Sequence, residues 1–440
     1  MLRTIPAIGI TLLLALVLVA AISSGQAYGA DTGWCDPSAY VNSGWTNPSY
    51  AYTSNDQYAD ADNDGDIVQY YNFDIPTIPS GSTINGIAVS IEGYRSGVLF
   101  LVNARQADVS LSWNGGSSYT SGSEGLKRTD MQTAETTETL GGDGGDAADD
   151  WGRTWSDTEF TNANFRVRLD AIASGELNKH LYIDQVQVRV HYTLPTTTTS
   201  ISADLSDPIT YGDNITFTAT VTGSAGSNTP SGTVTFMDGA TTLGTGTLSG
   251  SGLTATATFS TTALTVGTHA SITAVYAGDS NFSGSTSSSI SRTVNAKALT
   301  ITASNISKTY GDTYAFAGTE FTTSGLVNSD TVTSVTLTSA GAAASATVAG
   351  SPYSITPSAA VGSGLANYSI GYSDGSLTVG QRDLTVTATG VNKVYDGTTS
   401  ATVILSTDAL GGDDVTASYG GATFADKNVG AGKAVSVTGI

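Results

Sequence analysis

The alternation of apolar and polar residues along most of the chain constrains its fold more than any other feature. In 184–192, three valines alternate with glutamine, arginine and histidine, and the segments 87–91 and 165–169 alternate in the same way. A strand turns successive side chains to opposite faces of a sheet, so a period of two predicts half-buried antiparallel strands. No amphipathic helix is predicted beyond residue 30, and the predicted fold class is therefore all-β.

The composition agrees with this class and excludes others. Charged residues make up 12% of the 440 residues, the formal net charge is −21, and there is one cysteine. We expect no nucleic-acid binding, because contacts to phosphates need lysine and arginine. One cysteine excludes a disulfide framework and a thiolate zinc site. Frequent threonine, valine and tyrosine are typical of sheets whose outer faces carry small polar side chains.

Residues 1–30 have the pattern of a secretory signal. A basic start at Arg3 precedes an apolar run from Ile5 to Ile22, and small residues follow it. We expect cleavage between positions 27 and 30. The alternative is an uncleaved anchor, although the run is short for a bilayer span. We therefore expect an extracellular or cell-surface protein with no membrane span after cleavage, whose anchoring segment is not in this chain.

A change in composition separates an N-terminal domain from the rest. All five tryptophans and the cysteine precede Pro195, and no lysine or arginine occurs between Val190 and Ser291. Residues 31–194 are predicted to form one β-sandwich, with a jelly-roll-like topology. We call these residues the head.

The part that follows the head is repetitive. The segment Leu299–Ala303 recurs 85 positions later as Leu384–Ala388, and Thr-Tyr-Gly-Asp at 210–213 recurs at 309–312. Such periods with many short strands are typical of tandem Ig-like β-sandwich modules. We expect modules at 196–295, 297–380 and 382–440, with short linkers that favour a stiff rod. At the same offset the closing strands of the third module would start near residue 452, which predicts an incomplete module and a fragment of a longer protein.

Each of the three modules resembles a known family. Residues 196–295 resemble a bacterial Ig-like domain, on the segments Ile209–Gly212, Gly232–Phe236 and Val275–Phe282. Residues 297–380 are similar to the MBG module, on Lys308–Asp312, Ser351–Tyr353 and Asn367–Ile370. Residues 382–440 resemble the YDG module, on Tyr395-Asp396-Gly397. The head looks like a β-sandwich of secreted and phage-associated proteins, on Trp45–Pro48, Phe73–Pro76, Ile84–Ile87 and Trp151-Gly152.

These resemblances imply a secreted or surface-attached, adhesin-like protein of a bacterium or an archaeon. In such proteins the Ig-like, MBG and YDG modules act as a stalk, and none of the families implies catalysis. The motif Gly371-Tyr372-Ser373-Asp374-Gly375 has the esterase spacing, but a strand follows it where a nucleophile needs a helix. We therefore predict a protein that is not an enzyme.

An acidic loop in the head is a candidate calcium site. Asp60, Asp62, Asp64 and Asp66 alternate around Asn63 and Gly65. Carboxylates at this spacing wrap oxygen ligands around Ca²⁺, and the glycine permits the sharp turn. The bidentate glutamate of an EF-hand is missing, because Tyr71 stands at position twelve. The alternative is an acidic surface loop ahead of a strand.

Tryptophans of the head are candidate ligand contacts. Trp151 and Trp155 follow a glycine-rich loop and could offer flat faces for stacking on sugar rings. The alternative is packing in the core. We therefore expect a recognition head for an extracellular glycan or a surface protein, carried on an Ig-like stalk. Two other functions remain open: an accessory part of a secreted polysaccharide-degrading enzyme, and a structural component of a surface layer or matrix.

Overall fold

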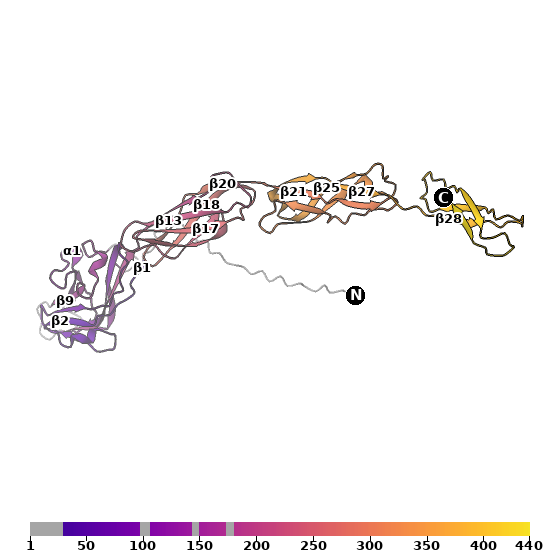
Figure 1. The fold of residues 1–440 in the computed structure, drawn as a ribbon. Helices are drawn as coiled ribbons and strands as arrows, with labels where there is room; N and C mark the ends of the chain where they lie inside the picture. Colours follow the sequence, from indigo (N-terminus) through magenta and orange to yellow (C-terminus); the bar gives the residue numbers. More distant parts are fainter. Residues whose placement is uncertain (1–29, 97–105, 143–148, 173–179) are drawn as a thin grey trace, which may run out of the picture. The chain divides into compact units, whose positions relative to one another are not determined.

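The computed structural model describes residues 30–96, 106–142, 149–172 and 180–440. The predicted signal, apart from Ala30, lies outside these residues. Strands make up nearly all the regular structure (Figure 1), so the all-β prediction is confirmed. No helix in these four segments is long and apolar enough to cross a membrane.

The head is a sandwich of two antiparallel sheets. In the first, which we call sheet A, the order is β1-β10-β5-β8, and β3 also pairs with β10. Its strands are β1 (Ala30–Asp31), β3 (Ala59–Ala61), β5 (Thr83–Arg95), β8 (Thr136–Gly141) and β10 (Leu181–Thr193). In the second, sheet B, the order is β2-β4-β9-β6-β7. Its strands are β2 (Ala39–Ser43), β4 (Ile67–Tyr71), β6 (Gln106–Ser112), β7 (Lys127–Arg128) and β9 (Arg166–Ile172).

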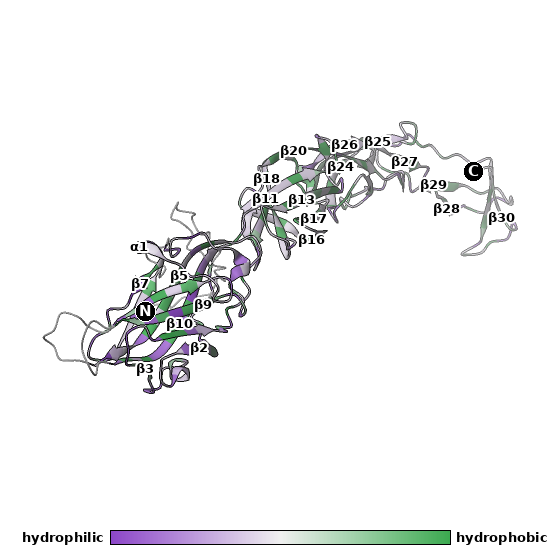
Figure 2. Ribbon diagram, turned by 90° about the vertical axis from the view of Figure 1, so that its left-hand side faces the viewer, coloured by the Kyte–Doolittle hydropathy of each residue, from purple (hydrophilic) through white to green (hydrophobic). Residues whose placement is uncertain are grey.

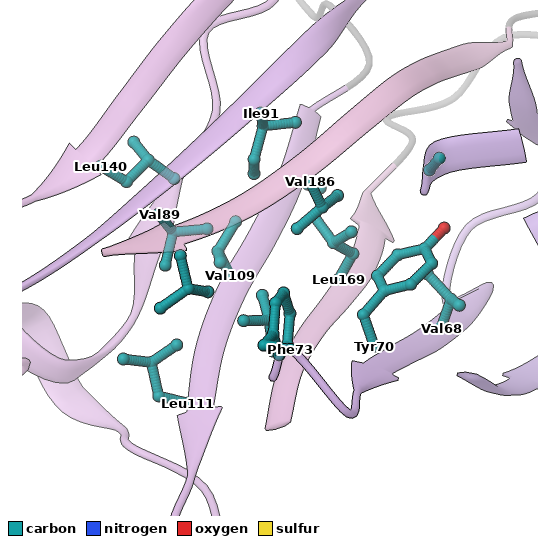
Figure 3. Packing of buried hydrophobic residues seen from close by; sticks show 14 of the residues in the cluster. Val68, Tyr70, Phe73, Val89, Ile91, Val109, Leu111, Leu140, Leu169 and Val186 are labelled. Carbon is teal, nitrogen blue, oxygen red and sulfur yellow. The ribbon is translucent and has the colours of Figure 1, made fainter. Parts of the chain in front are cut away.

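The sequence alternation places one side of the longer head strands in a common core. Val186, Val188 and Val190 of β10 are fully buried, whereas the polar residues between them are half-buried. Figure 3 shows side chains of sheet A, such as Val89 and Ile91, directed toward those of sheet B. Burial of each such aliphatic side chain stabilises the head by about 1.5–3 kcal/mol. Short helical turns connect the strands: η1 (Pro48–Ala51), α1 (Gly122–Gly125) and η2 (Asp157–Glu159).

The next module consists of a four-stranded and a six-stranded sheet. The first has the order β11-β13-β17-β16, and the second β12-β20-β18-β14-β15 with β19 on β18. The strands of the four-stranded sheet are β11 (Thr197–Ala203), β13 (Ile215–Gly223), β16 (Ser249–Ser251) and β17 (Thr254–Thr261). Those of the six-stranded sheet are β12 (Ile209–Thr210), β14 (Thr233–Asp238), β15 (Thr241–Thr247), β18 (Gly267–Gly278), β19 (Ser283–Thr286) and β20 (Ile290–Asn295). Alternate residues of β13, including Phe217, are fully buried, as in a sandwich.

The module that follows has a three-stranded sheet, β23-β21-β26, and a four-stranded sheet, β22-β27-β25-β24. Its strands are β21 (Lys297–Ala303), β22 (Ile306–Thr309), β23 (Phe321–Ser324), β24 (Thr331–Thr338), β25 (Tyr353–Ser363), β26 (Tyr368–Ser373) and β27 (Gly375–Gly380). Helical turns lie at η3 (Ala340–Ala342) and η4 (Leu365–Asn367). The closing strands β26 and β27 run parallel to β21 and β22.

The last module has two separate two-stranded sheets. One is β28 (Val386–Gly390) with β29 (Val403–Thr407), and the other is β30 (Gly421–Phe424) with β31 (Val435–Thr438). Its buried core consists of three small residues, Ala401, Val403 and Ala422. In Figure 2 the head strands show long hydrophobic stretches, whereas little of this module is strongly hydrophobic.

Buried Tyr70 and half-buried Tyr52 predict that the head loses stability in alkali. Burial raises the pKa of Tyr70, whose hydroxyl donates to the Pro48 carbonyl at 3.0 Å. Burial, followed by the charges of Tyr40 and Tyr71, raises the pKa of Tyr52 to about 12. In the unfolded chain both hydroxyls ionise at about pH 10. Because folding raises their pKa values, the stability that the two protonated tyrosines contribute is complete below about pH 10 and is lost as the pH rises toward about 12. Tryptophan-fluorescence melts should show a constant Tm from about pH 7 to 9 and a falling Tm above about pH 10. A flat profile through the alkaline range would refute this account.

Candidate ligand-binding site

The structure corrects the prediction that Trp151 and Trp155 offer faces to a ligand. Their exposed fractions are 1% and 5%. Each indole N–H donates to a backbone carbonyl inside the head, Trp151 to Ile87 at 2.8 Å and Trp155 to Asp150 at 2.6 Å. A buried indole whose N–H has found a partner is typical of core packing.

Trp155 is also enclosed by a charged neighbour. The guanidinium of Arg153 lies 4.4 Å from the Trp155 ring and 4.0 Å from the ring of Trp113. The same guanidinium binds both carboxylate oxygens of Glu159, at 3.2 and 2.9 Å. The cation of Arg153 therefore occupies the face of the Trp155 ring that a sugar would need.

The acidic loop does not bring its four carboxylates together. Asp60 lies on β3 and binds Nδ1 of His180 at 2.8 Å. The buried carboxylate of Asp66 accepts the backbone N–H of Asn63 at 2.9 Å, inside the loop itself. Asp62 and Asp64 are exposed and have partners of their own. These contacts favour the acidic-loop interpretation, and calcium binding at this loop stays a prediction.

The site that the structure builds is a group of half-buried aromatic rings on the outer face of sheet A. It consists of Tyr58, Tyr94, His180 and Tyr182, which we call the tyrosine strip. The Tyr94 and Tyr182 rings stack at 4.7 Å between centroids, and His180 stacks on Tyr182 at 5.5 Å. Tyr58 meets the Tyr94 ring edge-on at 5.0 Å.

The strand register explains why these residues meet. Tyr182 of β10 is the direct cross-strand partner of Tyr94 on β5 and of Asp60 on β3. His180 precedes Tyr182 by two positions and so lies on the same face. Tyr58 comes directly before β3, which pairs with the start of β10. Three chain segments therefore bring the four rings together, with Tyr94 and Tyr182 on paired strands and Tyr58 and His180 directly before β3 and β10.

A β-bulge adds carboxylates beside the tyrosine strip. The register of β10 against β5 shifts between Ile183 and Gln185, which leaves Asp184 unpaired in the ladder. The carboxylate of Asp184 accepts the backbone N–H groups of Asn55 and Asp56 at 3.0–3.2 Å. Carboxylate oxygens of Asp56, Glu135 and Asp184 lie within 4.8 Å of one another. Among the described residues, no lysine or arginine forms an ion pair with these three.

The electrostatics of the strip keep its hydroxyls protonated. Burial raises the pKa of Tyr58, and its hydrogen bond to Glu135 raises it further. The pKa of Glu135 is also raised, first by burial and then by the nearby charges of Asp184, Glu92 and Asp56. The hydrogen bond from Tyr58 opposes this rise only in part. The pKa values of Tyr94 and Tyr182 are raised, first by burial. The tyrosine hydroxyls of the strip are therefore protonated at neutral pH and can donate hydrogen bonds.

Replacing Asp184 should loosen the turn that carries Tyr58. Asp184 is 1% exposed, and an alanine there would leave the N–H groups of Asn55 and Asp56 without an acceptor. We expect Asp184→Ala to lower the free energy of unfolding by about 1–3 kcal/mol. Asp184→Asn, which keeps an acceptor oxygen, should cost less. Urea unfolding followed by tryptophan fluorescence measures both, and equal costs would contradict this role.

The tyrosine strip was not predicted from the sequence, although a signal for it exists. Tyr94 and Tyr182 occupy the polar phase of their strands, where glycine, serine and glutamine are the usual neighbours. Large aromatic residues in that phase indicate a functional outer face. The cross-strand pairing that joins them could not be derived, because it depends on a register set by the bulge at Asp184.

Family models match the part of the chain that follows the head. Residues 192–295 match a bacterial Ig-like domain (group 3), residues 299–378 an MBG domain (YGX type), and residues 380–440 a YDG domain. Together these three matches support a modular, adhesin-like type of surface protein. None of the curated proteins matches it.

The three matched domains of this modular surface protein are not catalytic domains. Bacterial Ig-like and MBG domains are typical of extracellular proteins. The predicted Ig-like, MBG and YDG resemblances are thereby confirmed. The matches begin at residue 192, so the head, which carries the tyrosine strip, lies outside them apart from its last residues.

Proposed function

We propose that the head of this modular surface protein recognises an extracellular glycan, and that the modules after it display the head. The observation that carries the proposal is the tyrosine strip, because its four rings contact one another, two of them on paired strands, and remain partly open to solvent. Tyr58, Tyr94, His180 and Tyr182 would form the contact surface. No covalent chemistry is required of them.

The chemistry of the strip suits a neutral sugar. Tyrosine offers an apolar ring face, against which the C–H groups of a sugar pack, and a hydroxyl that donates or accepts a hydrogen bond. The carboxylates of Asp60 and Glu135 are acceptors for sugar hydroxyls. Binding sites combine apolar surface with a few placed polar groups in this way.

A screen of the full chain against a glycan array tests the proposal. We expect binding to one group of related glycans, and loss of that binding when Tyr94 and Tyr182 are both replaced by alanine. Tyr50→Ala is the matched control, because Tyr50 is 38% exposed in the same domain but lies outside the strip. No binding to any glycan would refute recognition of sugars and favour a purely structural role.

A further inference from the structure

The Thr-Tyr-Gly-Asp motif occupies the same place in the Ig-like and MBG modules. Its tyrosine, Tyr211 in the first module and Tyr310 in the second, donates its backbone N–H to the last residue of the closing strand, Asn295 or Gly380, at 2.9 Å. Each tyrosine is therefore held beside the residues that lead into the following module. The turn itself needs the glycine and the aspartate, so turn chemistry does not explain the tyrosine side chain.

The side chain of Tyr211 contacts the MBG module, and we call this contact the first joint. Its hydroxyl donates to the Asp330 carboxylate at 2.9 Å, and its ring meets that of Tyr368 edge-on at 5.5 Å between centroids. Gly212 follows with a φ of +86°, and a Cβ placed on it would lie 2.6 Å from a methyl carbon of Val327. The Ig-like module thus presents a hydroxyl and a bare backbone to an aspartate and a valine that are three positions apart.

The same pair of contacts joins the MBG and YDG modules, and we call it the second joint. The Tyr310 hydroxyl donates to the Asp413 carboxylate. Gly311 has a φ of +89°, and a Cβ placed on it would collide with a methyl group of Leu410. This leucine again precedes the aspartate by three positions, and in both turns the aspartate N–H donates to the carbonyl of the apolar residue at 3.0 Å. Two turns of different sequence therefore receive the same motif through the same two contacts.

Further hydrogen bonds cross the first joint beside the motif. The Thr262 hydroxyl donates to the Asn328 side chain at 2.7 Å, and the Asn328 amide donates to the Thr262 carbonyl at 2.8 Å. The backbone N–H of Val266 donates to Oδ1 of Asn367 at 3.0 Å. The residues of both joints belong to one compact unit of the chain, which consists of Ala203–Thr216, Ser260–Ala270 and Ser291–Ile440.

We propose that the Tyr-Gly pair of this motif is a docking element that couples the Ig-like module to the MBG module and the MBG module to the YDG module. Its receptor is a turn with an apolar residue three positions before an aspartate. A hydrogen bond to a carboxylate is stronger than one between neutral groups, so the tyrosine supplies the affinity. The glycine supplies the fit, because a side chain in its place would displace the apolar residue. The proposal is independent of glycan recognition by the head.

Amide hydrogen exchange on the full chain tests the docking element at the first joint. Tyr211→Phe keeps the ring and removes only the hydroxyl. We expect exchange over 262–268 and 326–331 to become about tenfold faster, because Val266 donates across the joint and 326–331 forms the receptor turn. Exchange over 215–223, in a core strand of the Ig-like module, should stay the same. Unchanged exchange in both joint segments would overturn the proposal.

Gly212→Ala tests the fit of the docking element and should also speed exchange at the first joint. Gly232→Ala is the matched control, because Gly232 has a φ of +88° in the same module but no atom of the described residues lies within 4 Å of the added Cβ. The control carries the same backbone strain without touching Val327. Equal exchange at the first joint in the two variants would overturn the role of the glycine. If Gly212→Ala also speeds exchange over 215–223, the module has unfolded, and Tyr211→Phe decides alone.

The second joint shows whether the effect is local. Tyr310→Phe should speed exchange over 408–414, which contains the receptor turn of the YDG module, and leave 262–268 unchanged. Tyr211→Phe should do the reverse. Faster exchange at both joints in either variant would indicate a general loosening of the chain and would overturn the assignment of each tyrosine to its own joint.

Discussion

Trp151→Ala should destabilise the head by about 3–5 kcal/mol, the cost of removing a large buried aromatic side chain. The ring fills the core, and its N–H is the donor to the Ile87 carbonyl. The truncation therefore leaves a cavity and removes one of two donors to the Ile87 carbonyl, which also accepts the backbone N–H of Gly142 at 3.2 Å. Since small domains are stable by only about 5–15 kcal/mol, this substitution removes much of the stability of the head.

The measurement is urea unfolding followed by tryptophan fluorescence. All five tryptophans lie in the head, so the signal reports on this domain alone. Trp34→Ala is the matched control, because Trp34 is half-buried and packs against the guanidinium of Arg189 at 4.2 Å. Trp34→Ala should lower the free energy of unfolding by about 1 kcal/mol. A Trp151→Ala head as stable as the Trp34→Ala head would contradict the core position and return Trp151 to the ligand candidates.

Replacing Tyr94 and Tyr182 should weaken glycan binding far more than it weakens the fold. Each ring forms part of a stacked surface, and loss of a central aromatic anchor costs about 2 kcal/mol of binding free energy, or about 30-fold in Kd. We expect each single alanine variant to bind at least this much more weakly, and the double variant to show no measurable binding. The rings are half-buried, so the head should remain folded at room temperature.

Conservative variants separate stacking from hydrogen bonding. Tyr182→Phe keeps the ring and should retain most of the affinity, whereas Tyr182→Ala should not. Tyr50→Ala should leave the affinity unchanged, because Tyr50 lies outside the strip. Calorimetry with the strongest ligand from the array measures all of these variants. Equal losses for Tyr50→Ala and Tyr182→Ala would show that the effect is a general one on the head.

The sequence was sufficient to predict the fold class because each strand carries its own alternation. The alternating valines of β10 could be predicted to be buried without knowing which strands pair with β10, and the structure buries them. The modules could also be recognised from the sequence, because their short motifs recur at fixed intervals along the chain. The closing-strand segments of the MBG module, near Asn367 and Leu377, were identified in the same way.

The candidate site could not be predicted, because it depends on contacts between distant segments. A tryptophan after a loop looks the same in a sequence whether it fills the core or faces solvent, and only packing shows that Trp151 is buried. The alternating aspartates gave a motif for calcium, but the contact of Asp60 with His180 crosses 120 residues of chain. The tyrosine strip joins residues as far apart as Tyr58 and Tyr182, which no local pattern connects.

The most direct test of glycan recognition by the tyrosine strip is a hydrogen-exchange footprint on the full chain. The strongest array ligand is added, and amide exchange is compared with and without it. We predict slower exchange in three segments, 56–60, 92–95 and 180–184, with the modules after residue 195 unchanged. A footprint elsewhere on the head, or on the Ig-like, MBG or YDG modules, would contradict the assignment of the binding surface to the tyrosine strip.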